Sequence, residues 1–357
     1  MQLRAHLRGW IPIESRENNP TYVRLIDAVL ASEELFTLAN EVPAPQLPAN
    51  VLFASVHFML LQGIRHDLAL HYPTVRLRHN LRDAPTSRLE DDFLDFTRVH
   101  RTELLDLLHH GITQTNEVAR SALLSAALCD LQRDGVTEVA LLDAGCSAGL
   151  NAFVEYYRIT HSPSCATGPE QSAIKLAPTH RGRLPHGELP RIVHRSGLDQ
   201  QPLDPSNLLD ATWLEACLWP DDPARFIRLR HALSIATQYR GELHLHEGDV
   251  VKDLEKVAGT IPRGPHLVIF SSWAAAYLPA GEHEAFTRKI DEIGRHRPVT
   301  WISCEHPAIA AALGLVSSDF RTEWPGASVL TRRTCGAEPS TALLGETHPH
   351  GEWINLA

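Results

Sequence analysis

The sequence predicts an α/β protein in which a helical domain, residues 1–135, precedes a Rossmann-like domain, residues 136–357. Two observations favour this class. Apolar residues recur at helical spacing before residue 135, whereas short apolar runs begin after Thr137. Helical stretches separate most of these runs, and strands that alternate with helices are typical of a parallel sheet with right-handed crossovers.

The helical domain contains four segments in which apolar residues recur at the spacing of one helix face. We predict helices over residues 22–39, 50–70, 89–108 and 117–131. Prolines at positions 43, 45 and 85 interrupt the pattern between them. No alternating pattern typical of strands is found in this part of the chain.

The second domain contains seven predicted strands. They cover residues 139–142, 191–194, 243–246, 266–270, 299–303, 328–332 and 341–344. The first is a continuous apolar run, which is typical of a parallel strand buried on both faces. No clear helix separates the last two, so they are expected to form an antiparallel hairpin. A mostly parallel sheet of about seven strands with such a hairpin suits a class I methyltransferase better than a dehydrogenase.

Residues 162–190 form an insertion rich in proline and glycine after the first helix that follows strand 139–142. Long loops of this kind often cover a substrate site, and a plain surface excursion is the alternative.

Composition narrows the kind of partner. The chain has 33 basic and 43 acidic residues and no dense basic run, so nucleic acid is not expected and a small molecule is favoured. The six cysteines form no CxxC pair, which argues against a zinc site and favours a reducing, cytoplasmic setting. Residues 1–20 lack the apolar core of a secretory signal, and the apolar stretch 51–64 is too short and too polar to span a membrane.

A turn of small residues follows the first predicted strand, from Asp143 through Gly145, Ser147 and Gly149. Small residues allow a ligand to approach the backbone closely, and a helix starting at Leu150 would favour a carboxylate or phosphate at its N-terminus. Asp143 is placed to accept a hydrogen bond from a cationic amine. S-Adenosylmethionine offers both an amine and a carboxylate, so it is the cofactor that this turn predicts.

The ends of later strands agree with this prediction, because ligands of doubly wound sheets lie across the carboxyl ends of the strands. Asp199 follows the second strand, where it would bind a ribose diol, and Asp249 follows the third, where it would meet the adenine amino group. Ser272 and Trp273 end the fourth strand, where the reacting methyl group would face the substrate. Trp273 is in a position to border the pocket.

Further polar residues are candidates for catalysis or for substrate binding. Glu117 is a candidate base, and Asn116 and Arg120 are candidate substrate contacts. The alternative is local, with Thr115 as a helix cap and Glu117 favourable in the first helical turn.

Glu305 and His306 follow the fifth strand, where one could be a base, although charged loops after strands are common. His57 is a candidate substrate contact within an apolar helix, or a satisfied core histidine. No metal is predicted, because no histidine pair has the spacing of metal ligands on one helix turn.

Two other classes of function fit the same residues. Gly145 to Gly149 matches G-x-S-x-G, so Ser147 could be the nucleophile of a serine hydrolase, with Asp249 and either His306 or His350. The helical chain before the turn and the lack of an HGGG segment argue against that fold. A protein that binds the cofactor without catalysis is the third possibility, because a fold does not by itself confer activity.

Several motifs together carry a family resemblance: Ala54 to His57 with His66, Tyr72-Pro73, Gln114 to Arg120, Ala144 to Asn151, Gly197 to Asp199, Cys217 to Pro220, Ser272-Trp273 and His350 to Trp353. With these motifs the chain resembles, over nearly its whole length, the domain-of-unknown-function 2332 family of bacterial proteins, described as methyltransferase-like. This resemblance implies the Rossmann-like fold, adds His350 to the candidate substrate residues and leaves the reaction open. We therefore expect an S-adenosylmethionine-dependent methyltransferase that acts on a small molecule.

Overall fold

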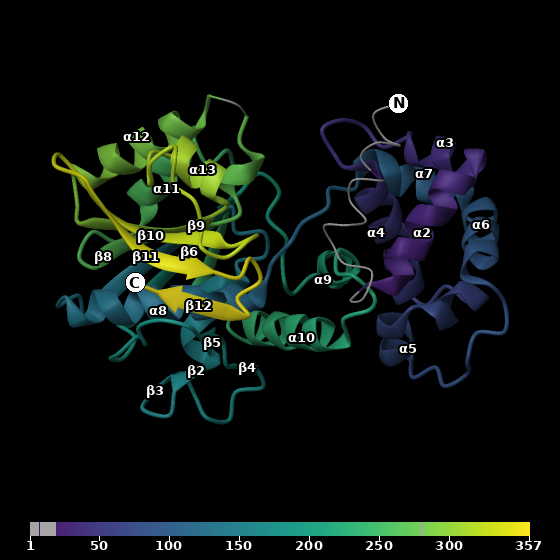
Figure 1. Ribbon diagram of the computed structural model, residues 1–357, viewed down its shortest axis with the longest axis horizontal. Helices are drawn as coiled ribbons and strands as arrows, with labels where there is room; N and C mark the ends of the chain where they lie inside the picture. The colour runs from purple at the N-terminus through teal and green to yellow at the C-terminus, as the bar shows by residue number, and fades with distance from the viewer. Residues whose placement is uncertain (1–6, 8–18, 280) are drawn as a thin grey trace. The chain divides into compact units, whose positions relative to one another are not determined.

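The structure is a computed structural model that describes residues 7, 19–279 and 281–357 (Figure 1). It divides into two compact units. Unit 1 comprises Met1–Thr115 and Asn207–Arg230, and unit 2 comprises Asn116–Ser206 and His231–Ala357. Most of the segment that was judged not to be a secretory signal, residues 1–20, lies outside the described residues.

The compact units do not coincide with the boundary predicted near residue 135. Residues 116–135 belong to unit 2 because α8 (Ser121–Arg133) packs against η3 (Leu150–Tyr156) and β2 (Arg158–Ser162). Residues 207–230 belong to unit 1 because α9 (Leu208–Ala216) packs against a helix of that unit.

Unit 1 is helical, as predicted. Its elements are α2 (Pro20–Ala31), α3 (Glu33–Ala39), α4 (Pro48–Leu61), η1 (Asp67–His71), α5 (Pro73–His79), α6 (Leu89–Val99), α7 (Arg101–His110) and α9, and the division between the units falls within α10 (Pro223–Gln238). The predicted helix 22–39 is two helices, because Ser32 ends α2 and its side chain accepts a hydrogen bond from Leu35 N (3.3 Å), which caps α3.

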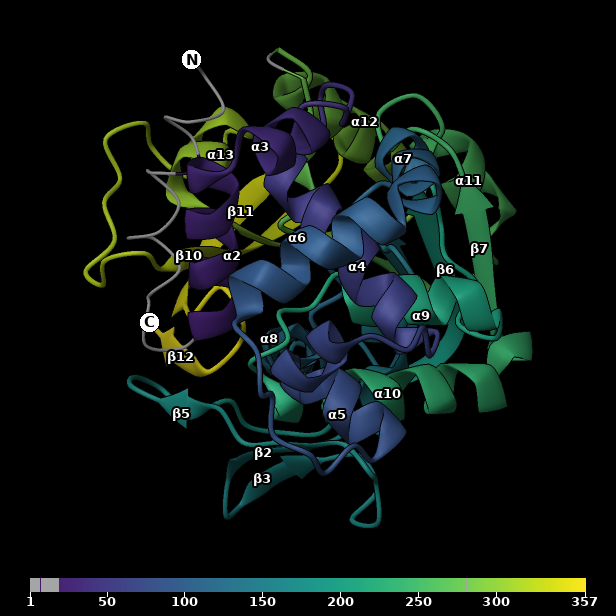
Figure 2. The same cartoon turned by 90° about the vertical axis from the view of Figure 1, so that its right-hand side faces the viewer.

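Helix α4 is the centre of unit 1 and contacts α3, α5, α7 and α9 (Figure 2). Every residue from Val51 to Leu61 is buried. A helix that is apolar all round is stable only when other elements cover every face, which is the position of α4.

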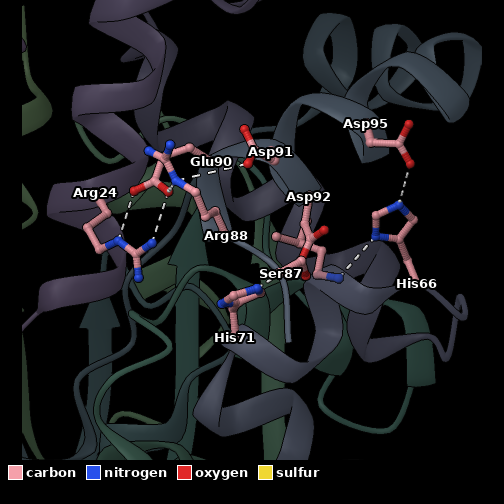
Figure 3. Close-up of polar contacts among 10 residues, drawn as sticks. Arg24, His66, His71, Ser87, Arg88, Glu90, Asp91, Asp92 and Asp95 are labelled. Carbon is pink, nitrogen blue, oxygen red and sulfur yellow. Dashed lines mark hydrogen bonds and ion pairs between the residues drawn. The ribbon is translucent and has the colours of Figure 1, made fainter. Parts of the chain in front are cut away.

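Side chains on α6 join this helix to α2 and η1 (Figure 3). Arg24 donates to both carboxylate oxygens of Glu90 at 2.9 Å, and this pairing lowers the pKa of Glu90 to about 2. His71 contacts Asp92 at 2.8 Å, and His66 contacts Asp95 at 3.1 Å. The acids in the first turn of α6 also suit the positive end of the helix dipole.

Unit 2 is built on one sheet of nine strands in the order β5-β12-β11-β10-β9-β8-β1-β6-β7. Their bounds are β1 (Glu138–Ala144), β5 (Thr179–His180), β6 (Arg191–Asp199), β7 (Leu243–Glu247), β8 (His266–Ser272), β9 (Val299–Glu305), β10 (Ser328–Cys335), β11 (Ser340–Thr347) and β12 (Trp353–Leu356). All seven predicted segments are strands, and β10 and β11 form the expected antiparallel hairpin. The sheet nevertheless has nine strands rather than about seven, because β5 and β12 are too short to show a periodic pattern.

Strands β7, β6, β1, β8 and β9 are parallel neighbours in that order. The chain moves outward from β1 in one direction and then returns to β8 on its other side. This reversal is the topological switch point of doubly wound sheets, beside which ligands usually bind.

Helices cover both faces of this sheet (Figure 1). On one face lie α11 (Leu254–Thr260), α12 (His283–Gly294) and α13 (Pro307–Ala312), and on the other lies α8. Phe286 of α12 packs edge-on against the buried Trp301 of β9, with 5.4 Å between ring centroids. Alternate residues of β1, including Ala140 and Leu142, join this apolar core.

The insertion predicted at 162–190 is largely folded. Strands β2, β3 (Cys165–Thr167) and β4 (Lys175–Leu176) form a separate three-stranded sheet, and β5 pairs with β12. Arg183 then binds both oxygens of the buried Asp130 on α8, at 3.2 and 2.6 Å. These contacts fix the insertion to unit 2.

Candidate functional site

The carboxyl ends of the parallel strands of unit 2 bring together most of the residues predicted to bind a cofactor. In the strand register Asp143 lies beside Gly197 on one side and Phe270 on the other. Asp199 is the last residue of β6, and Asp249 follows β7 by two positions. We call Asp143, the turn 145–149, Asp199 and Asp249 the rim.

The rim turn has a backbone that favours glycine. Gly145, Ser147 and Gly149 have φ of +80°, +53° and +68°. A Cβ on Gly145 would lie 2.3 Å from the Cβ of Ala274, in the loop after β8. The two glycines therefore serve the packing of the strand ends as well as any approach of a ligand.

The element after this turn differs from the predicted helix. Leu150–Tyr156 is a 3₁₀ segment, η3, interrupted by non-helical dihedrals at Phe153. Because a helix dipole requires several aligned turns, η3 supplies much less of the predicted attraction for a carboxylate. Most N–H groups of the turn are also used within the protein, since Gly145 N donates to Leu198 O, Ser147 N to Asp199 and Gly149 N to Cys146 O, each at 2.8 Å.

Asp143 is the most unusual group of the rim. It is 3% exposed, and its Oδ2 has no hydrogen-bond partner among the residues that the structure describes. Burial and the neighbouring Asp199 raise its pKa to about 7, against the opposing effect of Arg120. A buried carboxyl group with an unused oxygen is suited to bind a cation or a hydrogen-bond donor.

The other two acids of the rim hold their own loops. Asp199 accepts hydrogen bonds from Ser147 N at 2.8 Å and Gln201 N at 3.0 Å. Asp249 accepts from Val251 N at 2.8 Å and from Lys252 N at 3.0 Å through one oxygen. Each carboxylate oxygen has two lone pairs, so both acids keep acceptor capacity for a ligand.

A second group of predicted residues gathers beside the end of β8. Arg120 donates to Pro349 O at 2.8 Å and to Ser272 O at 3.2 Å, and its guanidinium lies 5.8 Å from the ring centroid of Trp273. Oε2 of the buried Glu117 lies 3.7 Å from Nδ1 of His350. We call Glu117, Arg120 and His350 the C-terminal cluster, because it joins η2 (Val118–Arg120) to the turn after β11.

Asn116 contacts the rim rather than this cluster. Its Nδ2 donates to Cys146 O at 2.6 Å, and it is 6% exposed. This hydrogen bond stabilises the turn. Its Oδ1 is buried and has no hydrogen-bond partner in the part of the chain that the structure describes.

The two residues predicted as bases after β9 have local partners. Glu305 is fully buried and accepts from Ala274 N and Ala275 N, both at 3.1 Å, and burial raises its pKa to about 7. Nδ1 of His306 accepts from Ala308 N at 3.2 Å and so caps α13. Glu305 thus positions the loop after β8, and His306 starts a helix.

His57 belongs to unit 1, whereas the rim and the C-terminal cluster belong to unit 2. Its side chain is fully buried, its Nδ1 lies 3.1 Å from Ala216 O, and its Nε2 lies 2.8 Å from Thr74 Oγ1. Both ring nitrogens are therefore engaged within the helical core. This is the arrangement of a satisfied core histidine, the alternative that the sequence left open.

Acid is expected to destabilise unit 1 through His57. Burial lowers its pKa from 6.5 to about 4, so its contribution to stability is present above pH 6.5 and is lost as the pH falls towards 4. The loss between pH 7.5 and 5 is about 2 kcal/mol, at 1.36 kcal/mol for each pKa unit. Urea unfolding of wild type and His57→Gln at both pH values measures this, and an equal loss in the two proteins would contradict it.

Among the described residues, the acid and the histidines proposed for a triad with Ser147 have other partners. Asp249 is bonded to the backbone of its own turn, and His306 caps α13. His350 faces Glu117 rather than Asp249. The positive φ of Ser147 is the feature that this turn shares with a nucleophile elbow.

A cavity of about 750 Å³ lies at the other end of the strands, near the starts of β6 and β7. Arg195 pairs there with Glu155 and donates to Glu242 at 2.9 Å, and Oε2 of Glu155 is buried with no hydrogen-bond partner among the described residues. Tyr156 also donates to Glu242, at 3.0 Å. The rim lies beside the topological switch point of the sheet and holds the buried Asp143, so it is the stronger candidate site.

Within residues 7, 19–279 and 281–357, no group of three or more His, Cys, Asp or Glu side chains could hold a metal ion. None of the helices in these same ranges combines the length and the apolar character needed to cross a bilayer. All six cysteines are free thiols.

Neither a curated protein nor a solved structure matches the chain. A family model does match it, over residues 12–355, and its description is "uncharacterized protein conserved in bacteria (DUF2332)". The match covers both compact units and every residue of the rim and of the C-terminal cluster. The chain therefore belongs to the DUF2332 family.

Proposed function

We propose that unit 2 binds S-adenosylmethionine along the rim and that the protein transfers its methyl group to a small molecule. Asp143 carries this proposal, because its buried carboxyl group, with one oxygen that has no hydrogen-bond partner among the described residues, is suited to a cationic or donating ligand. The ammonium of the cofactor's amino acid part has that chemistry. Charge-assisted hydrogen bonds of this kind are about twice as strong as neutral ones.

The rest of the rim fits the remaining parts of the same molecule. Asp199, at the end of β6, would hold the ribose hydroxyls, and Asp249, after β7, would accept from the adenine amino group. Asn116 and Glu305 support the loops on either side of the site by binding Cys146 O and the amides of residues 274 and 275. When bound, the cofactor would supply an electrophilic methyl group, and the chain would supply positioning.

Titration calorimetry with S-adenosylmethionine and S-adenosylhomocysteine tests this proposal on the full chain. A ligand at 100 times its Kd stabilises a folded protein by about 2.7 kcal/mol, which corresponds to a rise in Tm of about 5 °C or more. No heat of binding and no shift in Tm at millimolar ligand would refute the proposal. A protein that binds S-adenosylmethionine but forms no S-adenosylhomocysteine from it, when a panel of small methyl acceptors is supplied, would instead be a non-catalytic binding protein.

A serine hydrolase is the second candidate, and the positive φ of Ser147 is the observation that favours it. A fluorophosphonate probe separates the two functions. Under the methyl-transfer proposal we expect no labelling of Ser147. Labelling that Ser147→Ala abolishes would support the hydrolase.

A further inference from the structure

We infer that His350 accepts a proton from the substrate and that Glu117 is the positioning residue that orients it. The nucleophile would then be a group that carries a proton, such as a hydroxyl or an N–H. This inference rests on the proposed methyl transfer, and it defines the class of substrate for that reaction.

A proton acceptor must be accessible to the substrate, whereas the residue that orients it can be buried, and the two side chains differ in this way. The Glu117 side chain is 1% exposed, whereas the His350 side chain is 40% exposed. Oε2 of Glu117 lies 3.7 Å from Nδ1 of His350. A buried carboxylate beside Nδ1 favours the tautomer with the proton on Nδ1, which leaves Nε2 as the basic nitrogen.

The turn that carries His350 is fixed against the segment that carries Glu117. A Cβ on Gly351, whose φ is +74°, would lie 2.5 Å from Ala119 O and 3.2 Å from Arg120 N. Arg120 Nε donates to Pro349 O at 2.8 Å, one residue before His350. Contacts on both sides of His350 therefore fix its backbone, although 233 positions separate it from Glu117 in the sequence.

Arg120 also connects this pair with the rim. Its second hydrogen bond goes to Ser272 O, the last residue of β8, and its guanidinium lies over Trp273. The C-terminal cluster thus lies beside a strand end next to β1, which carries Asp143. A proton acceptor at this place is adjacent to the site proposed for the cofactor.

The neighbouring His348 has a different role. Its Nδ1 accepts from His350 N at 3.2 Å, and its Nε2 lies 3.9 Å from Glu352 Oε2. The Glu352 side chain is 72% exposed, so this pair lies near solvent. His348 shapes the turn, and Glu352 offers a matched control for Glu117.

The chemical step balances with these groups. The nucleophile's heavy atom bonds to the methyl carbon while the carbon–sulfur bond breaks and leaves its electron pair on sulfur. The nucleophile's proton passes to Nε2 of His350, and the resulting imidazolium is stabilised by the carboxylate of Glu117. A substrate that is already an anion would not need this pair.

Nitrogen-15 NMR of the histidine rings in the full chain tests the orientation, with His350→Gln used to assign the signals of His350. In the wild type we expect the His350 proton on Nδ1. Glu117→Gln should abolish this preference, and Glu352→Gln should leave it unchanged. A proton on Nε2 in the wild type, or identical His350 signals in Glu117→Gln, would overturn the inference. The first of these results needs only the assignment variant His350→Gln to fold and does not depend on Glu117→Gln.

Calorimetry with S-adenosylhomocysteine on the same proteins separates this inference from the proposed function. We expect Glu117→Gln and His350→Gln to bind it within about threefold of wild type, because neither residue belongs to the rim. A loss of more than tenfold in His350→Gln would place His350 in the cofactor site and refute its role as proton acceptor. If no protein binds the ligand, the proposed function fails, and the pairing of Glu117 with His350 is judged by the NMR result alone.

Discussion

Replacing Asp143 by Asn is expected to lower the affinity for S-adenosylhomocysteine about 10- to 100-fold while the protein stays folded at pH 7.5. Hydrogen bonds to charged groups contribute about 1.5–3 kcal/mol, which is the origin of that factor. Asn has nearly the same shape and removes a charge that is costly to bury. Calorimetry measures the affinity, and thermal unfolding measures the stability.

The pH dependence of the same variant follows from the pKa of Asp143. This pKa is about 7 in the folded protein and near 3.8 when the chain is unfolded, so the folded state holds the extra proton between these values. The contribution of Asp143 to stability therefore falls as the pH rises from about 4 to 7, and it is constant above that range. Asp143→Asn should lose this dependence.

Ligand affinity should follow the opposite trend, because the ammonium binds the ionised carboxylate. We expect the wild type to bind S-adenosylhomocysteine more tightly at pH 8 than at pH 6 and Asp143→Asn to show no such rise. Asp83→Asn, at an exposed position in unit 1, is the control and should match the wild type. Equal affinity in wild type and Asp143→Asn would remove Asp143 from the cofactor site.

Replacing Gly145 by Ala is expected to destabilise unit 2 by about 2–4 kcal/mol. Alanine at a φ of +80° costs about 1–2 kcal/mol, and the new Cβ would lie 2.3 Å from the Cβ of Ala274. Overpacking of this kind typically adds about 1–3 kcal/mol. Urea unfolding followed by circular dichroism measures the loss.

Two further variants separate the causes of that loss. Gly135 has a φ of +96°, and a Cβ there would have no atom within 4 Å, so Gly135→Ala should lose only the conformational part, about 1–2 kcal/mol. The double variant Gly145→Ala/Ala274→Gly lacks the Cβ of residue 274, so it should recover the part of the stability loss that is due to the steric clash. If Gly145→Ala and Gly135→Ala lower the free energy of unfolding by the same amount, the strand ends are not packed as tightly as the structure indicates.

Much of the fold could be predicted because its signals are local. Val139 to Leu142 is a continuous apolar run, and this composition alone identifies a strand buried on both faces. The rim could be predicted for a related reason, since parallel strands bring their carboxyl ends to one edge of the sheet independently of the conformation of the loops. The short strands β5 and β12 escaped prediction because two and four residues do not establish a period.

The sequence by itself determined the order of helices and strands and the position of the rim, because backbone periodicity and burial are properties of neighbouring residues. Only the tertiary structure decided which side chains are satisfied. His57 and Asp143 were both candidate ligand-binding residues. His57 has Thr74 and Ala216 as partners, whereas one oxygen of Asp143 has none in the part of the chain that the structure describes. Likewise Arg120 reaches Pro349 across 229 positions. Hydrogen-bond partners so distant in the chain depend on how the whole domain packs, and no local pattern encodes them.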